Sequence, residues 1–416
     1  YEQRDRYGET PRSFGREKQN KTKNKITANE VLIDYGGKMD KDKIYVRQIC
    51  FLFGAFILPV KLITAPAIAA KYAAEDLWIS ALINFMIDGL TILLICRLAN
   101  KFKGATVFEI VENTLGKTGK IIFAAAFYLF FTVKAYLPLI EHRNFVEIAM
   151  YETTPALWIF LPVFLLSAFF SYKGFRAAGR AADIAIWFSA SGIIILAALS
   201  LSVADFSNLL PIIDVPAINI LNGSVKTSIW FFDSPYLLFL LGHFKPEKKQ
   251  TLKITGGYFA FALVAIVYML ILQCEFGTLT ERQFFTPVKM GKYSVSVSNI
   301  GRIDYIAVFS IIMSCIFGVT LPILFASVCL EKTFPFRHKI TPCLISNGVI
   351  ALIIFFTENY YFVIRDFFQR DLIPVMCAFL LAPLALWFFK PVDKTGGGHD
   401  GGFIAERKKE SESCAF

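Results

Sequence analysis

Two hydrophobic stretches of this chain are interrupted near their middles by residues that break helices. They cover roughly residues 49–70 and 225–244. The interrupting residues are Pro59, Lys61 and Pro66 in the first stretch and Asp233, Ser234 and Pro235 in the second. In lipid, backbone polar groups need partners within the protein, so a broken span is tolerated where it lines a cavity. Two such spans in matching positions are typical of a transport-type binding site near the membrane midplane.

The composition of the chain places it in the membrane class. It is 55% hydrophobic and only 18% charged over 416 residues, and its mean hydropathy is +0.53. A soluble domain of this size carries more charge and less apolar surface. We therefore expect an all-α integral membrane protein.

Apolar runs near twenty residues long predict about ten transmembrane helices. We place them at residues 49–70, 77–99, 119–139, 156–172, 183–203, 225–244, 254–275, 303–330, 341–357 and 372–389. If the broken spans are the first and the sixth, the helices divide into two halves, 46–203 and 225–390. An odd number of spans in each half makes the second half enter the membrane in the opposite sense. This is a 5+5 inverted repeat with broken first and sixth spans, the arrangement of the leucine-transporter fold.

The basic residues indicate an orientation. Lys and Arg are frequent before residue 48 and recur in every second loop, for example at Lys173, Arg176, Lys248 and Lys249. By the positive-inside rule, both termini are predicted to be cytoplasmic. Because the net charge of +10 is concentrated in tails and short loops, nucleic-acid binding is not expected, and the basic tail is expected to lie against anionic lipid.

The two ends of the chain differ from its centre. Residues 1–45 form a polar, basic stretch, and residues 391–416 contain GGGHDGG and RKKESES. We expect a largely disordered cytoplasmic tail at 1–45, a transporter-like domain at 46–390 and a flexible cytoplasmic tail at 391–416.

Several segments resemble the spore germination permeases, the B subunits of nutrient germinant receptors. They are DLWISALINFMIDGLTILLICRLANKFKGATVFEIVENTLGKTGK, HRNFVEIAMYETTPALWI, GFRAAGRAADI, DFSNLLPIID and VSNIGRIDYIAVF. Their order and spacing extend the resemblance over roughly residues 45–390. That family belongs to the amino acid, polyamine and organocation transporter superfamily, which implies the same fold as the broken spans.

The resemblance also implies a function. The chain is expected to be a subunit in the bacterial cytoplasmic membrane, specifically the spore inner membrane, that binds a small nutrient such as an amino acid and signals germination. Implied partners are a large subunit with a cytoplasmic domain and a lipoprotein. The alternative is a proton-coupled amino acid or polyamine permease. An enzyme is not expected, because the chain has no HExxH, no GxSxG and no paired catalytic carboxylates.

Ionisable residues inside predicted spans are candidates for the functional site, because a charge in the membrane interior is costly. Lys61 stands where family members usually have a glycine, and Asp233 lies in the other break. The fold brings the two breaks together, so we expect Lys61 and Asp233 to pair or to flank a bound zwitterion. Snorkelling of Lys61 toward the interface remains the competing interpretation. The predicted substrate-binding residues are Lys61, Leu62, Ile63, Thr64, Asp233 and Ser234.

Other polar residues near the breaks have less certain roles. The hydroxyl groups of Thr64 and Ser234 are expected to face either a ligand or the broken backbone. Asp88 and Lys134 are predicted to support the site or relay charge, with Asp88 protonated or bonded to Lys134. Snorkelling of Lys134 to the outer interface is the favoured alternative.

The remaining charged and metal-binding residue types give weaker signals. We expect Glu141, Glu275 and Asp304 to be solvated at the membrane interfaces. The scattered His and Cys residues predict no metal site, no cofactor and no disulfide framework.

Overall fold

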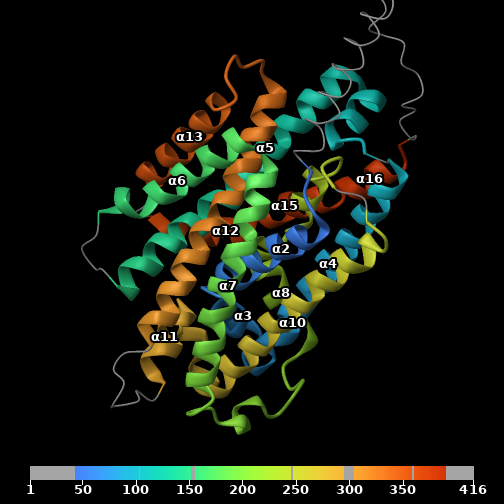
Figure 1. Ribbon diagram of the computed structural model, residues 1–416. Coiled ribbons are helices and arrows are strands. Elements are labelled where there is room, and N and C mark those ends of the chain that lie inside the picture. The colour runs from blue at the N-terminus through green and yellow to red at the C-terminus, as the bar shows by residue number, and fades with distance from the viewer. Residues whose placement is uncertain are drawn as a thin grey trace, which may run out of the picture. The chain divides into compact units, whose positions relative to one another are not determined.

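The computed structural model describes residues 43–102, 104–150, 155–244, 247–294, 304–357 and 360–389 (Figure 1). The predicted tails lie almost entirely outside these residues. From Ile44 onward the chain forms a compact unit. The helices of the described residues are α2 (Val46–Lys61), α3 (Ala65–Ala73), α4 (Leu77–Lys101), α5 (Val107–Ala149), α6 (Ala156–Lys173), α7 (Phe175–Ser200), α8 (Ala217–Phe231), α9 (Ser234–Phe239), α10 (Gln250–Phe276), α11 (Thr286–Tyr293), α12 (Asp304–Thr333), α13 (Thr341–Thr357), α14 (Tyr361–Phe367), α15 (Ile373–Leu380) and α16 (Ala382–Trp387).

The first interruption predicted from the sequence is a real helix break. α2 ends at Lys61, and α3 begins at Ala65 after a short non-helical segment. Pro66 lies in the first turn of α3, where its missing N–H is not needed and its fixed φ favours a helix start. The first apolar run therefore forms two short helices, and the backbone groups between them lack partners within a helix.

The second interruption is also a break. α8 ends at Phe231 and α9 begins at Ser234, with Pro235 in its first turn. Phe232 has φ −41° and ψ 71°, which is not helical and turns the chain between the two helices. The backbone groups freed here are the last carbonyls of α8 and the first amides of α9.

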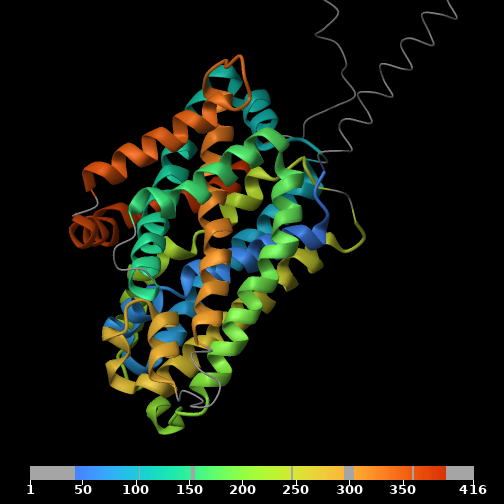
Figure 2. The same cartoon turned by 60° about the vertical axis from the view of Figure 1, so that its left-hand side comes forward.

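Seven helical segments of the described chain are long and apolar enough to cross a membrane, and α13 is a shorter apolar helix. Among these seven, the segment containing α12 is the most enclosed by protein. α12 packs mainly against α5 and α7 and runs through the bundle beside α7 (Figure 2). The predicted number of ten spans is not established by these lengths, but the helices follow the predicted order.

Close packing of α12 against α2 depends on a glycine. A Cβ added at Gly318 would lie 2.8 Å from Val60 Cγ2 and 3.4 Å from the Ala55 carbonyl oxygen. Small residues at such crossings let helix backbones approach, which is how helices associate in lipid. This contact holds the first broken span against the most enclosed helix.

Some helix bounds differ from those predicted. α5 continues to Ala149, well past the predicted end of the third span, and it contains a kink at Gly116, where φ is 73°. The last apolar segment begins at Tyr361, earlier than predicted, and includes a π-helical turn at Phe368–Leu372. Apolar runs locate the middle of a span better than its ends, because polar residues can extend a helix.

Candidate functional site

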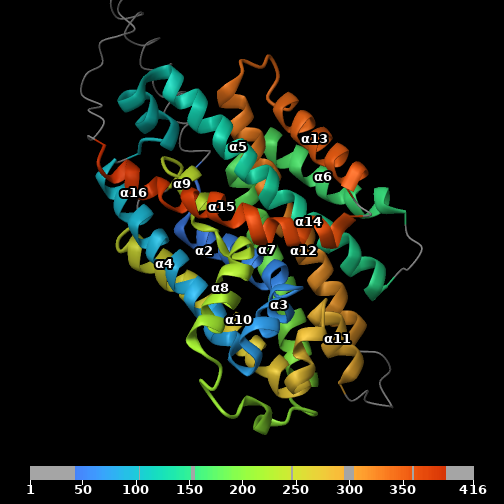
Figure 3. The ribbon, with the colours of Figure 1, turned by 180° about the vertical axis from the view of Figure 1, so that it is seen from behind.

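The two helix breaks face each other in the interior of the bundle. α3 lies beside α8 (Figure 3), and Lys61 at the end of α2 reaches Asp233 in the other break. The Lys61 Nζ lies 2.5 Å from the Asp233 Oδ2, and both side chains are fully buried. The structure therefore places the pair as the sequence predicted and excludes snorkelling of Lys61.

The ammonium group of Lys61 has a complete set of acceptors. It donates hydrogen bonds to the carbonyl oxygens of Trp230 and Phe231, at 2.5 Å and 3.3 Å. Its nitrogen also lies 5.2 Å from the ring centroid of Phe56 and 4.9 Å from that of Phe231. The two carbonyls are among those left free at the C-terminal end of α8, where the helix dipole favours a cation.

A second lysine approaches the same carboxylate. Lys134 on α5 is buried, with its Nζ 3.6 Å from the Asp233 Oδ1 and 3.1 Å from the Ile229 carbonyl oxygen. The alternative that Lys134 snorkels outward is therefore wrong. The helix rotation turns this side chain inward, so that one carboxylate faces two ammonium groups.

Asp88 on α4 binds the first turn of α9. Its carboxylate accepts hydrogen bonds from the Asp233 and Ser234 amides, at 3.0 Å and 2.9 Å, and from the Tyr258 hydroxyl at 3.0 Å. The described contacts of Asp88 include no ion pair with Lys134, so the predicted bond between them is absent there. Asp88 instead satisfies amides that the second break leaves free.

Glu141 on α5 connects both breaks to the last apolar segment. Its Oε1 accepts hydrogen bonds from the Thr64 hydroxyl at 2.8 Å and the Tyr361 hydroxyl at 3.1 Å. Its Oε2 accepts one from the Trp230 Nε1 at 3.0 Å. The expectation that Glu141 is solvated is wrong, since it is fully buried. The Thr64 hydroxyl binds this carboxylate rather than the broken backbone.

The other two carboxylates predicted at the interfaces are also partly or fully enclosed. Asp304 is buried, contrary to the prediction, at the first residue of α12. Glu275 is half-buried near the end of α10. Among the described residues, no three His, Cys, Asp or Glu side chains lie close enough to hold a metal ion.

The carbonyl groups of the first break are bound by α11. The Thr286 amide donates to the Ile63 carbonyl oxygen at 3.0 Å, and the Thr286 hydroxyl donates to the Leu62 carbonyl oxygen. Pro287 follows in the first turn of α11. Leu62 and Ile63 are buried at the break, and their carbonyls are paired within the protein. Their role in substrate binding stays a prediction.

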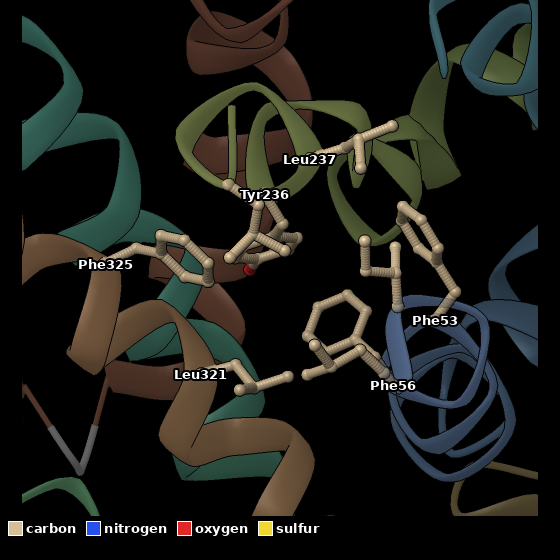
Figure 4. Close-up of a pocket in the computed structure, with 9 residues that line it drawn as sticks. Phe53, Phe56, Tyr236, Leu237, Leu321 and Phe325 are labelled. Atoms are coloured by element: carbon tan, nitrogen blue, oxygen red, sulfur yellow. The ribbon is translucent and has the colours of Figure 1, made fainter. Parts of the chain in front are cut away.

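An apolar cavity lies between α2, α9 and α12 (Figure 4). The ring of Phe56, which lines it, has its centroid 5.2 Å from the Lys61 Nζ and 5.6 Å from the Lys134 Nζ. The cavity encloses about 320 Å³ when its opening is included. Aromatic residues line much of it, among them Phe53, Phe56, Tyr236 and Phe325. Within the described residues, the buried hydroxyl groups of Tyr236 and Ser234 have no hydrogen-bond partner.

Sequence comparison identifies the family. A model of the family described as "Spore germination protein" matches residues 43–363, which is most of the chain and includes both breaks. The chain belongs to the spore germination protein family. It is therefore an integral membrane protein of the permease type, as the resemblance of its segments implied.

Individual relatives of this spore germination protein are distant. It is 20% identical over 233 residues to the spore germination protein YndE of Bacillus subtilis (strain 168), a match that covers 55% of this chain and 64% of that protein. The chain thus matches a little under two thirds of that relative's length.

A solved structure has a similar fold. It is the substrate-bound, outward-open state of a Na⁺-coupled sialic acid symporter. The two structures align with a TM-score of 0.55 and 11% sequence identity, and the alignment covers 81% of this chain and 78% of the symporter. This likeness supports the leucine-transporter type of fold predicted from the broken spans.

Several residues of the site in this spore germination protein were not predicted. The prediction missed Phe56, Trp230, Tyr236 and Tyr258, whose aromatic groups surround the charged pair or bind its neighbours. Each lies within an apolar helix, so its sequence context gives no indication of which way it faces. The proximity of Trp230 and Tyr236 to the second break was the available signal.

Proposed function

We propose that this spore germination protein is a receptor subunit that binds a small zwitterionic nutrient, such as an amino acid, between its two helix breaks. The observation that carries the proposal is the buried ion pair of Lys61 and Asp233, which joins one break to the other. Binding would signal germination if the nutrient favours one of two conformations of the bundle, since differential affinity is sufficient for such a shift.

The chemistry of the pair selects a zwitterion. A ligand that carries only an ammonium group and displaces Lys61 from Asp233 leaves that lysine without its partner, and an unpaired buried charge costs about 3–5 kcal/mol. A zwitterion can insert between the partners, with its ammonium group against Asp233 and its carboxylate against Lys61 and Lys134. Every charge then keeps an opposite charge nearby.

The described conformation is closed to such a ligand. Lys61 and Asp233 are in direct contact between the two breaks, and Thr286 covers the carbonyls of the first break. Binding therefore requires the two breaks to separate. This requirement is what would link occupancy of the site to the shape of the bundle.

A ligand screen on the purified full chain tests the proposal. Nutrients are added singly, and the melting temperature in detergent is recorded, because a ligand that binds the folded state raises it. We expect at least one amino acid to stabilise the wild type, while its decarboxylated amine and its deaminated acid do not. If no zwitterion stabilises the protein, the proposed nutrient site is wrong.

The role of Asp233 is tested by Asp233→Asn, which keeps the side-chain size and removes the charge. We expect the response to an active amino acid to be lost while membrane insertion is retained. Asp183→Asn is the matched control. Asp183 lies away from the breaks, and its Oδ2 pairs with the Arg47 Nη2 at a distance of 3.3 Å. An unchanged nutrient response in Asp233→Asn would remove Asp233 from the site.

Proton-coupled transport of an amino acid or polyamine is the second candidate function. It is favoured by the structural likeness to a symporter. Uptake of the stabilising nutrient into proteoliposomes, driven by a proton gradient, distinguishes it from sensing alone. Accumulation above equilibrium supports the permease, whereas binding without uptake supports the receptor.

The receptor proposal also includes partners and a location. Family membership supports a place in the spore inner membrane, together with a subunit that bears a large cytoplasmic domain and a lipoprotein. Affinity purification of the tagged chain from spore membranes should recover both subunits in stable ratio. Recovery of the chain alone would favour the permease.

A further inference from the structure

We propose that the second helix break is a preformed binding site for a primary ammonium group, and that the side chain of Lys61 occupies this site as a built-in competitor. The proposal rests on the proposed function only in assuming that a nutrient amine takes this place when it binds. The existence of the ammonium site itself follows from the contacts of Lys61.

The surroundings of the Lys61 nitrogen match what a primary ammonium group requires. Such a group has three N–H donors and no acceptor. Within 3.3 Å of it lie three oxygens, from the Asp233 carboxylate and from the Trp230 and Phe231 carbonyls. The Phe56 and Phe231 rings lie within 5.2 Å and present faces that attract a cation.

Almost all of these groups belong to the second break rather than to the segment that carries Lys61. All three oxygens come from residues between Trp230 and Asp233, at the carbonyl end of α8. Asp88 holds the Asp233 and Ser234 amides from the other side, which fixes the turn independently of Lys61. Removal of the Lys61 side chain should therefore leave the oxygens in place around an empty position.

Asp233 has a second cation beside it when Lys61 withdraws. The Lys61–Asp233 contact is an ion pair at 2.5 Å. The Lys134 Nζ lies 3.6 Å from the Asp233 Oδ1. Because Lys134 belongs to α5 and not to the first break, it remains beside the Asp233 carboxylate when Lys61 withdraws. An amine from solution can then replace Lys61 without leaving Asp233 isolated.

Chemical rescue of Lys61→Ala tests this site. The substitution removes the atoms from Cγ to Nζ, which together correspond to n-propylammonium. We expect purified Lys61→Ala to melt below the wild type and to gain about 3 °C, saturably, when n-propylammonium is added. The wild type should gain nothing, because its own lysine fills the site.

Three controls separate a specific site from a general salt or solvent effect. Lys61→Met fills the same space without a charge and should show no gain. Lys61→Ala combined with Asp233→Asn should also show none, and 1-propanol should not replace the amine. If Lys61→Ala is recovered only when n-propylammonium is present during extraction from the membrane, the yield becomes the readout, with the same controls.

The outcomes keep this proposal distinct from the nutrient proposal. The ammonium site would be overturned if n-propylammonium stabilised the wild type or Lys61→Met as much as Lys61→Ala. It would also be overturned if 1-propanol stabilised Lys61→Ala equally well, or if n-propylammonium rescued neither the melting temperature nor the yield of Lys61→Ala. Rescue of Lys61→Ala together with no amino acid response in the wild type would uphold the ammonium site and reject the nutrient receptor. A nutrient response of the wild type without rescue of Lys61→Ala would uphold the nutrient receptor and reject the ammonium site.

Discussion

At the scale of single residues, Glu141 joins three segments of the described site. Its carboxylate accepts hydrogen bonds from three donors on three segments, Thr64, Trp230 and Tyr361. A hydroxyl group can turn to accept instead, but the Trp230 indole N–H can only donate. The Glu141 oxygen that faces Trp230 must therefore act as an acceptor, whereas the oxygen that faces the two hydroxyls is not restricted in this way.

We predict that Glu141→Gln lowers the stability of the protein by about 1–3 kcal/mol, because its amide N–H₂ must face either the Trp230 N–H or the Thr64 and Tyr361 hydroxyls, which then lose their acceptor. Adding Trp230→Phe removes the indole N–H, so the double variant should lose less than the sum of the two single variants. Melting temperatures of the four proteins in one detergent measure this coupling. Glu147→Gln on the same helix, whose partner is the half-buried Arg143, should have a small effect. Additive losses would contradict the proposed arrangement.

Residue-level prediction from the sequence worked where the signal was local. Proline and charge within an apolar run marked Lys61 and Asp233, and the structure pairs them. It failed for Lys134 and Glu141, which are buried although a polar residue near the end of a predicted span suggested the interface. Both lie on α5, and the side they face depends on how that helix is rotated against α8, which no local pattern encodes.

At the scale of helices, the kink in α5 depends on one residue. Gly116 has φ 73° and ψ −175°, and a Cβ added there would meet nothing within 4 Å. Space is therefore no obstacle to a side chain, but the backbone conformation is, because residues other than glycine rarely adopt it.

We predict that Gly116→Ala destabilises the protein by about 1–3 kcal/mol through backbone strain. Gly256→Ala is the matched control, since Gly256 lies inside α10 and is equally unobstructed. Alanine in a helix interior should leave stability unchanged or raise it by up to about 1 kcal/mol. Thermal melting of both variants checks the prediction, and equal effects of the two substitutions would argue against a strained kink.

The breaks were predictable as elements, whereas their partners were not. Prolines placed the start of α3 and the first turn of α9 within a few residues. By contrast, α11 lies in the loop between the predicted seventh and eighth spans, where no apolar run announced a helix. Its contact with Leu62 and Ile63 joins segments more than 200 residues apart, and such long-range pairing is not visible in the sequence alone.

At the scale of the whole molecule, the orientation in the membrane is still a prediction from charge. The segment 203–216 contains no Lys or Arg, whereas Lys248 and Lys249 follow the second break. The positive-inside rule places these segments on opposite sides, with the lysines in the cytoplasm.

Cysteine labelling of intact cells tests this orientation. In a background whose reactive native cysteines are replaced, we expect Asp214→Cys to react with a membrane-impermeant maleimide and Lys248→Cys to react only after permeabilisation. Both positions are exposed in the structure, so a lack of reaction reports sidedness rather than burial. The opposite labelling pattern would invert the predicted topology and move both termini outside.

The contacts of Asp88 limit the chemistry open to any ligand of this protein. Half-helices at the midplane of transporters commonly attract anions to their positive ends. Here the positive end of α9 already holds a carboxylate that the protein supplies, at 3.0 Å and 2.9 Å from its first amides. An incoming acid group must therefore be recognised by lysine side chains rather than by main-chain amides of α9, so a neutral hydroxyl or ester in place of that acid should be discriminated against strongly.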